Sequence, residues 1–291
     1  MKKSSILLVD DHPMLRKGVA QLISLEDNLI VIAEANSGDE AITLAIEHAP
    51  DLILLDLNMK GLTGIETLSA DISNLDDVKR IAEKVSSLAP CADIVVNNAG
   101  IVSAGYLTET PLEEWQRLYN LNVRGLVGLL QQLTPAMEAQ GLQDQQPRHI
   151  VNIASAAGLL AFPGMSAYSA TKAAVISLSD CLRVEMAPAK IGVTTICPTY
   201  VRTPIAETVQ IFGRMDTPKI HKSVAKGFSK AKLTGDDIAR ETLQAINKNK
   251  SLVILGGDGK LGHFMQRISR QLFSNQMAKI TLKSHRKNKV A

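Results

Sequence analysis

Short apolar runs alternate along almost the whole chain with longer segments in which apolar residues recur at helical spacing. Each run has the length and the Val, Ile and Leu content of a strand that is buried on both faces of a parallel sheet. Strands that alternate with helices in this way favour a three-layer, doubly wound and mostly parallel α/β sheet in a single domain. The strands are expected within residues 5–9, 29–35, 51–57, 92–98, 149–155, 193–198 and 251–255.

Composition narrows the class of protein further. The chain has 291 residues, of which 45% are hydrophobic, and this is ample for a proper core. The formal net charge is only +3, and we expect the basic tail 276–291 to be a disordered, solubilising end rather than a nucleic-acid site. Three cysteines without a Cys-x-x-Cys pair argue against a disulfide framework and a zinc site. No apolar run reaches about 18 residues, so we expect a cytoplasmic protein with no membrane partner.

The most informative block is "IVNIASAAGLLAFPGMSAYSATKAAVISLSDCLRVEMA" (150–187). Tyr168 and Lys172 are four residues apart on a predicted helix, so both project from one face. A lysine ammonium in that position can lower the pKa of the phenol toward a value suited to acid/base catalysis. Ser155 ends the preceding strand, and Asn122 lies on the helix before that strand. Singly, Ser155 or Asn122 could equally be an ordinary polar residue, but the set predicts a catalytic group.

Residues from about 69 to 275 resemble a short-chain dehydrogenase/reductase, because this block and three further motifs occur in the family's order: "NNAG" (97–100), "NLNVRG" (120–125) and "PTYVRT" (198–203). The resemblance implies that Tyr168 is the catalytic acid/base, and that Lys172 lowers its pKa and binds the nicotinamide ribose. It implies that Ser155 hydrogen-bonds the substrate oxygen and that Asn122 holds a proton-relay water. It also implies a site for NAD or NADP formed by Asp71, Asn97, Ala99, Gly100, Pro198 and Thr203. One departure is Thr199, where the family usually has glycine after the proline.

The other half of that family's signature, a Thr-Gly-x-x-x-Gly-x-Gly turn after the first strand, is missing. A dinucleotide fold needs those glycines so that backbone N–H groups can approach the pyrophosphate at a helix N-terminus. Here the turn is "VDDHPML" (9–15). A carboxylate about 5 Å from a diphosphate charge costs on the order of 3 kcal/mol at an effective dielectric constant of about 20. We therefore expect NAD(P) binding to be weak or absent.

A second resemblance accounts for the aspartates. Residues 1 to about 68 are similar to the first half of a response-regulator receiver domain, through "ILLVDDHPMLRKGVAQLI" and "VIAEANSGDEAITLAIEHAPDLILLDLNMKGLTGIETL". This resemblance implies that Asp10, Asp11 and Asp56 bind Mg²⁺, that the carbonyl of Asn58 completes the metal site, and that Asp56 accepts a phosphoryl group. Oxygen ligands suit a hard cation such as Mg²⁺. The structural alternative is that the paired aspartates only cap a helix.

The two resemblances meet near "GIETLSADIS" (64–73), so the sequence indicates a chimera with a Rossmann/flavodoxin-like hybrid fold. The receiver part lacks the Ser/Thr and the Lys that its family carries at the ends of the fourth and fifth strands, so phosphorylation-driven signalling is not expected. A receiver strand and a dehydrogenase strand also compete for one position in the sheet. "DLILLDL" is the stronger core strand, whereas "TLSADIS" is short and half polar. We therefore expect 52–56 in the sheet and 67–73 displaced or irregular.

A Gly-x-Gly-x-x-Gly pattern at Gly257, Gly259 and Gly262 could be mistaken for the missing phosphate turn. It follows the last predicted strand and leaves no room for a further βαβ unit, and no acidic residue ends a second strand after it. We interpret it as an ordinary turn from strand to helix.

Three functions from different classes remain open. The first is an NAD(P)-dependent oxidoreductase that acts on a small-molecule alcohol or carbonyl compound, with activity impaired or lost because the glycine turn is replaced. The second is a phospho-accepting or Mg²⁺-binding receiver fragment, and the third is an engineered, catalytically silent fold chimera. The dehydrogenase-like helices could also pair in a homo-oligomer. Residues 204–235, which would cover a substrate, show no pocket signature that identifies it.

Overall fold

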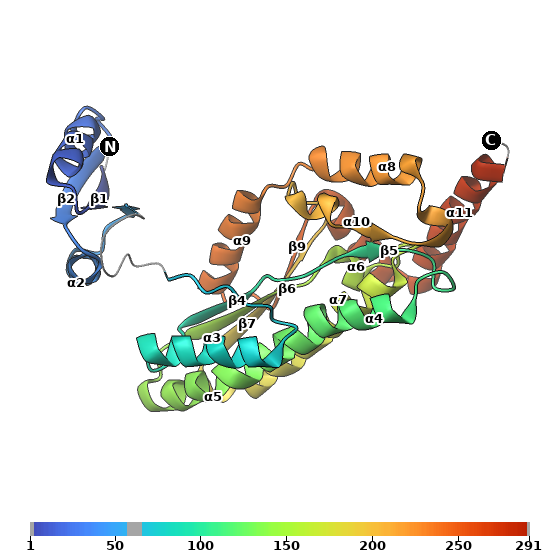
Figure 1. Cartoon of the computed structure of the whole chain (residues 1–291), viewed down its shortest axis with the longest axis horizontal. Coiled ribbons are helices and arrows are strands. Elements are labelled where there is room, and N and C mark those ends of the chain that lie inside the picture. The colour runs from blue at the N-terminus through green and yellow to red at the C-terminus, as the bar shows by residue number, and fades with distance from the viewer. Residues whose placement is uncertain (1–2, 57–65, 290–291) are drawn as a thin grey trace. The chain divides into compact units, whose positions relative to one another are not determined.

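The chain folds as an α/β protein with parallel strands, as the sequence predicts. The computed structural model describes residues 3–56 and 66–289. They divide into two compact units, Met1–Ser69 and Ala70–Ala291. The main strands lie in two parallel sheets, one in each unit, and not in one continuous sheet as expected (Figure 1). The main strand pairs are all parallel, so the predicted α/β fold class is confirmed. The prediction of a single sheet is wrong.

The first unit has the strand order β2-β1-β3, with every pair parallel. β1 lies in the middle, and the register pairs Leu7 with Ala33 on one side and with Ile53 on the other. Both edges of β1 are therefore occupied within the first sheet. The elements are β1 (Ser4–Val9), α1 (Pro13–Ser24), β2 (Leu29–Ala35), α2 (Gly38–His48) and β3 (Leu52–Leu55).

Of the two segments predicted to compete for one position in a sheet, 52–56 and 67–73, the first forms a strand. Residues 52–55 form β3, whereas residues 66–74 contain neither helix nor strand. Four consecutive apolar residues pair better with a parallel neighbour than the half-polar segment does. The prediction for both segments is confirmed.

Burial in the first unit is lower than the sequence predicts. Its core consists of Leu7, Val9, Ala35 and Ala41, and α1 buries no residue at all. β3 leaves Leu52 53% exposed and Leu54 44% exposed. The expectation of burial on both faces is confirmed for β1, whose residues 6–9 are all buried, and is wrong for the outer strands β2 and β3.

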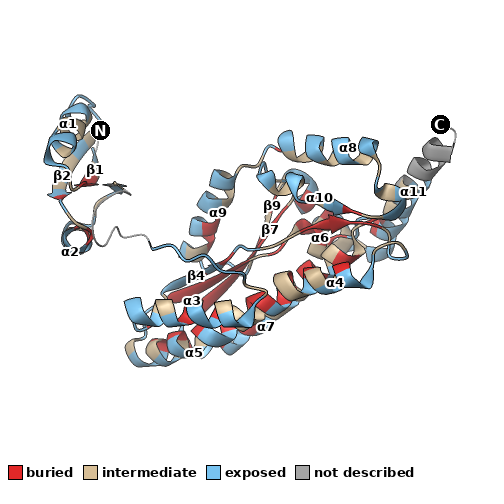
Figure 2. Cartoon of the chain, viewed as in Figure 1, coloured by how far each residue is buried: buried red, intermediate tan, exposed pale blue. Residues whose placement is uncertain are grey.

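The second unit is a three-layer sandwich around the sheet β4-β6-β7-β9. Helices α3, α5 and α7 pack on one face, where Leu130, Met137 and Val175 are buried. On the other face, α9 packs Ala245 against Val151 and Ile196 (Figure 1). The central strands β6 and β7 are buried along nearly their whole length, whereas β4 alternates exposed and buried residues (Figure 2). Only the middle of this sheet therefore matches the predicted burial on both faces.

Four of the remaining strands, β4, β6, β7 and β9, overlap predicted segments, whereas the two-residue strands β5 and β8 were not predicted. The strands are β4 (Ile94–Asn97), β5 (Ser103–Ala104), β6 (Arg148–Ile153), β7 (Ile191–Pro198), β8 (Gln210–Ile211) and β9 (Leu252–Leu255). The α-helices are α3 (Leu75–Leu88), α4 (Leu112–Tyr119), α5 (Leu126–Asp144), α6 (Ala156–Leu159), α7 (Ser166–Glu185), α8 (Pro218–Ser229), α9 (Gly235–Asn247), α10 (Gly257–Ile268) and α11 (Arg270–Lys289). A π-helical turn, η1 (Asn120–Gly125), joins α4 to α5, and short 3₁₀ turns are η2 (Ala187–Ala189), η3 (Pro204–Glu207) and η4 (Gly213–Met215).

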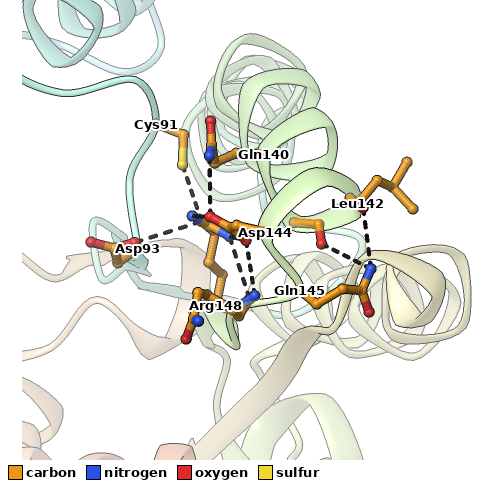
Figure 3. A network of polar contacts seen from close by, with 9 residues as sticks. Cys91, Asp93, Gln140, Leu142, Asp144, Gln145 and Arg148 are labelled. Atoms are coloured by element: carbon orange, nitrogen blue, oxygen red, sulfur yellow. Dashed lines mark hydrogen bonds and ion pairs between the residues drawn. The ribbon is translucent and has the colours of Figure 1, made fainter.

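A buried arginine fixes the start of β6 (Figure 3). The Arg148 guanidinium donates to both carboxylate oxygens of Asp144 at the end of α5, at 3.0 and 2.8 Å. Its Nε also donates to the Cys91 sulfur, 3.1 Å away in the segment before β4. The same guanidinium holds the pKa of Asp144 well below its usual range. This network therefore ties the start of β6 to the end of α5 and to the segment before β4.

The C-terminal segment departs from the sequence prediction. The tail 276–291 was expected to be disordered, yet α11 continues through Lys289. The segment after Gly262 contains no Gly or Pro, and Lys, Arg, Gln and Leu favour a helix. None of the described helices combines the length and the apolar character that crossing a membrane requires.

Candidate active site

Tyr168 and Lys172 lie one turn apart on α7. Lys172 is buried, and its Nζ donates to the Ile153 carbonyl at the end of β6, 2.9 Å away. The same Nζ lies 6.0 Å from the centre of the Tyr168 ring. Burial lowers the pKa of Lys172 to about 8. The lysine therefore joins the catalytic helix to the sheet next to the phenol.

The pKa of Tyr168 reflects the burial of its side chain. Burial raises this pKa above its ordinary value of 10.0, and a hydrogen bond with the Ser155 side chain only partly opposes that rise. The phenol is consequently protonated at neutral pH. The lowering of the Tyr168 pKa by Lys172 stays a prediction.

Ser155 follows β6 directly and caps α6. Its backbone is extended, and its Oγ accepts a hydrogen bond from the Ala157 N–H at 3.1 Å. This is the ordinary role of serine before a helix, and it fixes the hydroxyl in the neighbourhood of Tyr168. The cap and the catalytic candidate are thus the same group.

Asn122 lies in the π-helical turn η1 and is almost completely buried. Its Oδ1 accepts from the Ile101 N–H and its Nδ2 donates to the Ile101 carbonyl, both at 2.9 Å. A side chain on Gly100 would place its Cβ 3.2 Å from Lys172 Nζ and 3.4 Å from Asn122 Oδ1. The absence of a side chain at Gly100 therefore lets the "NNAG" loop pass beside both groups.

The sequence analysis missed Thr171. Its Oγ1 accepts from Asn122 Nδ2 at 3.1 Å and donates to the Tyr168 carbonyl at 2.8 Å. It is buried and joins η1 to the turn of α7 that carries the phenol. Its position three residues after Tyr168, on the same helix face, was the available signal.

The residues predicted to bind the cofactor fall into two groups. Ala99, Gly100 and Pro198 lie at or just after the carboxyl ends of β4 and β7, the edge where open α/β sheets bind ligands. Thr203 is exposed at the start of η3. Asp71 is also exposed, and its Oδ1 accepts from the backbone N–H and the hydroxyl of Ser73, both at 2.8 Å.

Asn97 lies in a buried chain of side-chain hydrogen bonds. Its Nδ2 donates to Asn152 Oδ1 at 2.7 Å. Asn152 in turn donates to the Ser179 hydroxyl at 2.9 Å. These side chains join β4, β6 and α7, and the part of Asn97 in cofactor binding stays a prediction.

The fit of a nicotinamide dinucleotide differs between the two units. In the second unit, Gly100, Lys172 and Asn122 lie together, and these residue types suit the nicotinamide end. In the first unit, the turn between β1 and α1 presents Asp10 and Asp11 where the family has glycines, and that turn does not suit a diphosphate.

The acidic residues of the first unit do converge. Carboxylate oxygens of Asp10, Asp11 and Asp56 and a ring nitrogen of His12 lie within 4.8 Å of one another. Asp56 reaches this position because its N–H donates to the Val9 carbonyl at 2.8 Å. His12 is an addition to the predicted set, and its Nδ1 lies 2.8 Å from Asp11 Oδ1. The fourth predicted ligand, Asn58, falls outside the described residues.

Comparisons with known proteins bear on both units. The family described as "short chain dehydrogenase" matches residues 33–211. The chain is 31% identical over 244 residues to "Probable oxidoreductase EphD" of Mycobacterium tuberculosis, covering 78% of this chain but only 40% of that relative. It is also 53% identical over 66 residues, 23% of the chain and 32% of the relative, to the "Nitrate/nitrite response regulator protein homolog" of Haemophilus influenzae.

Among solved structures, the chain is similar in fold to a short chain dehydrogenase/reductase from Burkholderia phymatum in complex with NAD. The TM-score is 0.62 at 20% identity, with 93% of this chain and 95% of that chain covered. At this level of identity the likeness concerns the fold alone. The family match begins at residue 33, inside the segment that also resembles a receiver.

Proposed function

Because the chain belongs to the short chain dehydrogenase family, we propose that its second unit acts on an alcohol or carbonyl group of a small molecule, with NAD or NADP as cofactor. The observation that carries the proposal is the convergence of Tyr168, Ser155 and Lys172 at the end of β6. The position of Gly100 supports it too, because this residue lies beside both Lys172 and Asn122. A structural neighbour with NAD bound supports the cofactor class.

The protonated Tyr168 phenol suits the proton-transfer step of carbonyl reduction. Bound NAD(P)H would supply the hydride that reduces a carbonyl carbon. The Tyr168 phenol, whose pKa burial raises, can donate its proton to the carbonyl oxygen. The Ser155 hydroxyl would orient that oxygen from the turn after β6. In the reverse reaction, oxidation of an alcohol, the Tyr168 oxygen would accept the proton.

Dinucleotide affinity is the weak point of this proposal. Asp10 and Asp11 replace the glycines that would approach the pyrophosphate, and each carboxylate near a phosphate charge costs on the order of 3 kcal/mol. We therefore propose an impaired oxidoreductase in which the proton-transfer residues are in place and cofactor binding is poor.

The test has two parts: a measurement of NADH and NADPH binding, and a measurement of the reduction rate after the Tyr168 hydroxyl is removed. Calorimetric titration of NADH and NADPH should show no binding tighter than about 1 mM, or roughly 4 kcal/mol. Carbonyl reduction at saturating cofactor should fall by about 10² to 10⁴-fold in Tyr168→Phe. Tyr119→Phe is the matched control, because Tyr119 is 54% exposed on α4. An unchanged rate in Tyr168→Phe would refute the assigned role.

A second candidate function concerns the first unit. The cluster of Asp10, Asp11, Asp56 and His12 has the oxygen ligands that Mg²⁺ takes, and the similarity to a response regulator covers a segment of this length. We propose a divalent-cation site in which Asp56 is the group that accepts a phosphoryl. The same observations support a chimera of a receiver half and a dehydrogenase, natural or engineered. A cytoplasmic location and a homo-oligomer built through the dehydrogenase-like helices remain predictions.

A further inference from the structure

Helix α10 packs against the rest of the second unit through two of its glycines. A Cβ on Gly259 would lie 2.8 Å from Thr199 Cγ2, and one on Gly262 would lie 2.8 Å from Leu160 Cδ1. Both glycines are buried. These two glycines of the Gly-x-Gly-x-x-Gly pattern therefore let α10 pack closely against its neighbours. This agrees with the interpretation of the pattern as an ordinary turn from strand to helix.

The large apolar residues of α10 point the other way. Leu261 is 60% exposed, Phe264 62% and Ile268 68%. At 100° per residue these positions, with Met265, form one stripe on the side opposite to the glycines. Leu272 on α11 is 65% exposed as well. An amphipathic helix normally buries such a stripe, so this pair of helices presents an unusual outer face, mostly exposed along α11 (Figure 2).

The charge around this stripe has one sign. Residues 257–291 contain eight Lys or Arg residues and one acidic residue, Asp258, which gives +7 for a segment of a chain whose total is +3. Arg267 and Lys260 lie on the helix beside the apolar stripe, and the other basic residues follow along α11 and the chain end: Arg270, Lys279, Lys283, Arg286, Lys287 and Lys289.

We propose that α10 and α11 bind the surface of an anionic lipid bilayer. The apolar stripe would enter the headgroup region while the basic residues contact acidic headgroups, which is how interfacial helices without a membrane span adsorb. A second copy of the chain fits the same face less well, because it would bring two segments of +7 together. The proposal revises the expectation of no membrane partner and does not depend on the proposed oxidoreductase activity.

The first experiment measures partitioning of the full-length protein onto sedimented vesicles. Vesicles with about 30% phosphatidylserine in phosphatidylcholine should bind the protein at least about tenfold more strongly than pure phosphatidylcholine. Neutralising the exposed Lys260, Arg267 and Lys279 to Gln should lower the partition coefficient by about 100-fold, at about fivefold per charge. Equal binding to both vesicle types, or none to either, would overturn the proposal.

Matched apolar variants separate insertion from simple charge attraction. Phe264→Ser should weaken binding to the acidic vesicles by about tenfold. Leu243→Ser should leave it unchanged, because Leu243 has a similar exposure of 61% on α9. Circular dichroism checks that both variants fold.

Tryptophan fluorescence reports whether the apolar stripe of α10 enters the headgroup region. In a Trp115→Phe background, which removes the single tryptophan, Phe264→Trp should shift its emission to the blue on acidic vesicles and Leu243→Trp should not. A chain that is dimeric in solution and becomes monomeric in Ile268→Ser, with no vesicle binding by the parent, would assign the face to a second copy instead.

Discussion

His149 makes the stability of the second unit depend on pH in a way that the structure predicts. The side chain is buried on β6, and its Nε2 lies 2.7 Å from Thr194 Oγ1. The Thr194 hydroxyl donates to the Lys250 carbonyl at 2.6 Å, so it must accept from His149 Nε2–H. The other nitrogen, Nδ1, packs against Gly192, where an added Cβ would come within 2.4 Å of it. Protonation therefore has to place a charge on Nδ1 in a confined, buried position.

The sign and size of the effect follow from the pKa. Burial, with the nearby Arg183 charge, lowers the pKa of His149 from 6.5 to about 4. The unfolded chain thus binds this proton more readily than the folded unit does. The contribution of the neutral histidine is fully present above about pH 6.5 and is lost as the pH falls toward about 4. Between pH 7 and pH 5 the linkage relation gives a loss of about 2 kcal/mol.

The assay is urea unfolding at a series of pH values, followed by the fluorescence of Trp115, which lies in the same unit. His149→Gln is the comparison, because its amide can still donate to Thr194 but does not titrate. The variant should be less dependent on pH, and the difference between the two unfolding free energies should change by about 2 kcal/mol between pH 7 and pH 5. Parallel curves over that range would refute the reasoning.

Three further predictions concern other sites. Replacing Asp10 and Asp11 together by Gly should tighten NADH binding measured by calorimetry, since two carboxylates are removed from the phosphate turn; no gain would show that this turn does not limit affinity. Saturating Mg²⁺, at about 100 times its dissociation constant, should stabilise the parent by about 2.7 kcal/mol in a thermal melt, and Asp56→Asn should abolish most of the shift; an unchanged melt in the parent contradicts the cation site. Gly125→Ala should destabilise the second unit by about 1–3 kcal/mol, because the new Cβ would lie 2.5 Å from the Ile72 carbonyl, while Gly235→Ala has open space and should not.

The periodicity of the sequence was enough to predict the strands and the approach of the catalytic candidates. The run 29–35 matches β2 residue for residue, and four-residue spacing placed Tyr168 and Lys172 on one face of α7. Ser155 joined them because parallel strands end at a common edge of the sheet. These are local and topological rules, which the sequence expresses directly.

What the sequence could not predict depends on burial and on pairing between distant segments. The raised pKa of Tyr168 comes from its surroundings, to which many segments contribute. The pairing of β1 with β3 joins segments more than 40 residues apart. The exposure of the apolar stripe of α10 could not be predicted. Hydrophobic periodicity gives the width of an apolar helix face, but it does not show whether a neighbouring element covers that face.

The outer edge of β4 has a consequence for handling the protein. In the described sheet of the second unit, β4 stands at the end and pairs with β6 alone. Its outward residues Ile94 and Val96 are 50% and 49% exposed. An end strand with exposed apolar side chains can offer its backbone amides to strands from other molecules, so concentrated samples should form β-rich aggregates over time. A single lysine at Val96 would interrupt that growth by charge repulsion without entering the core.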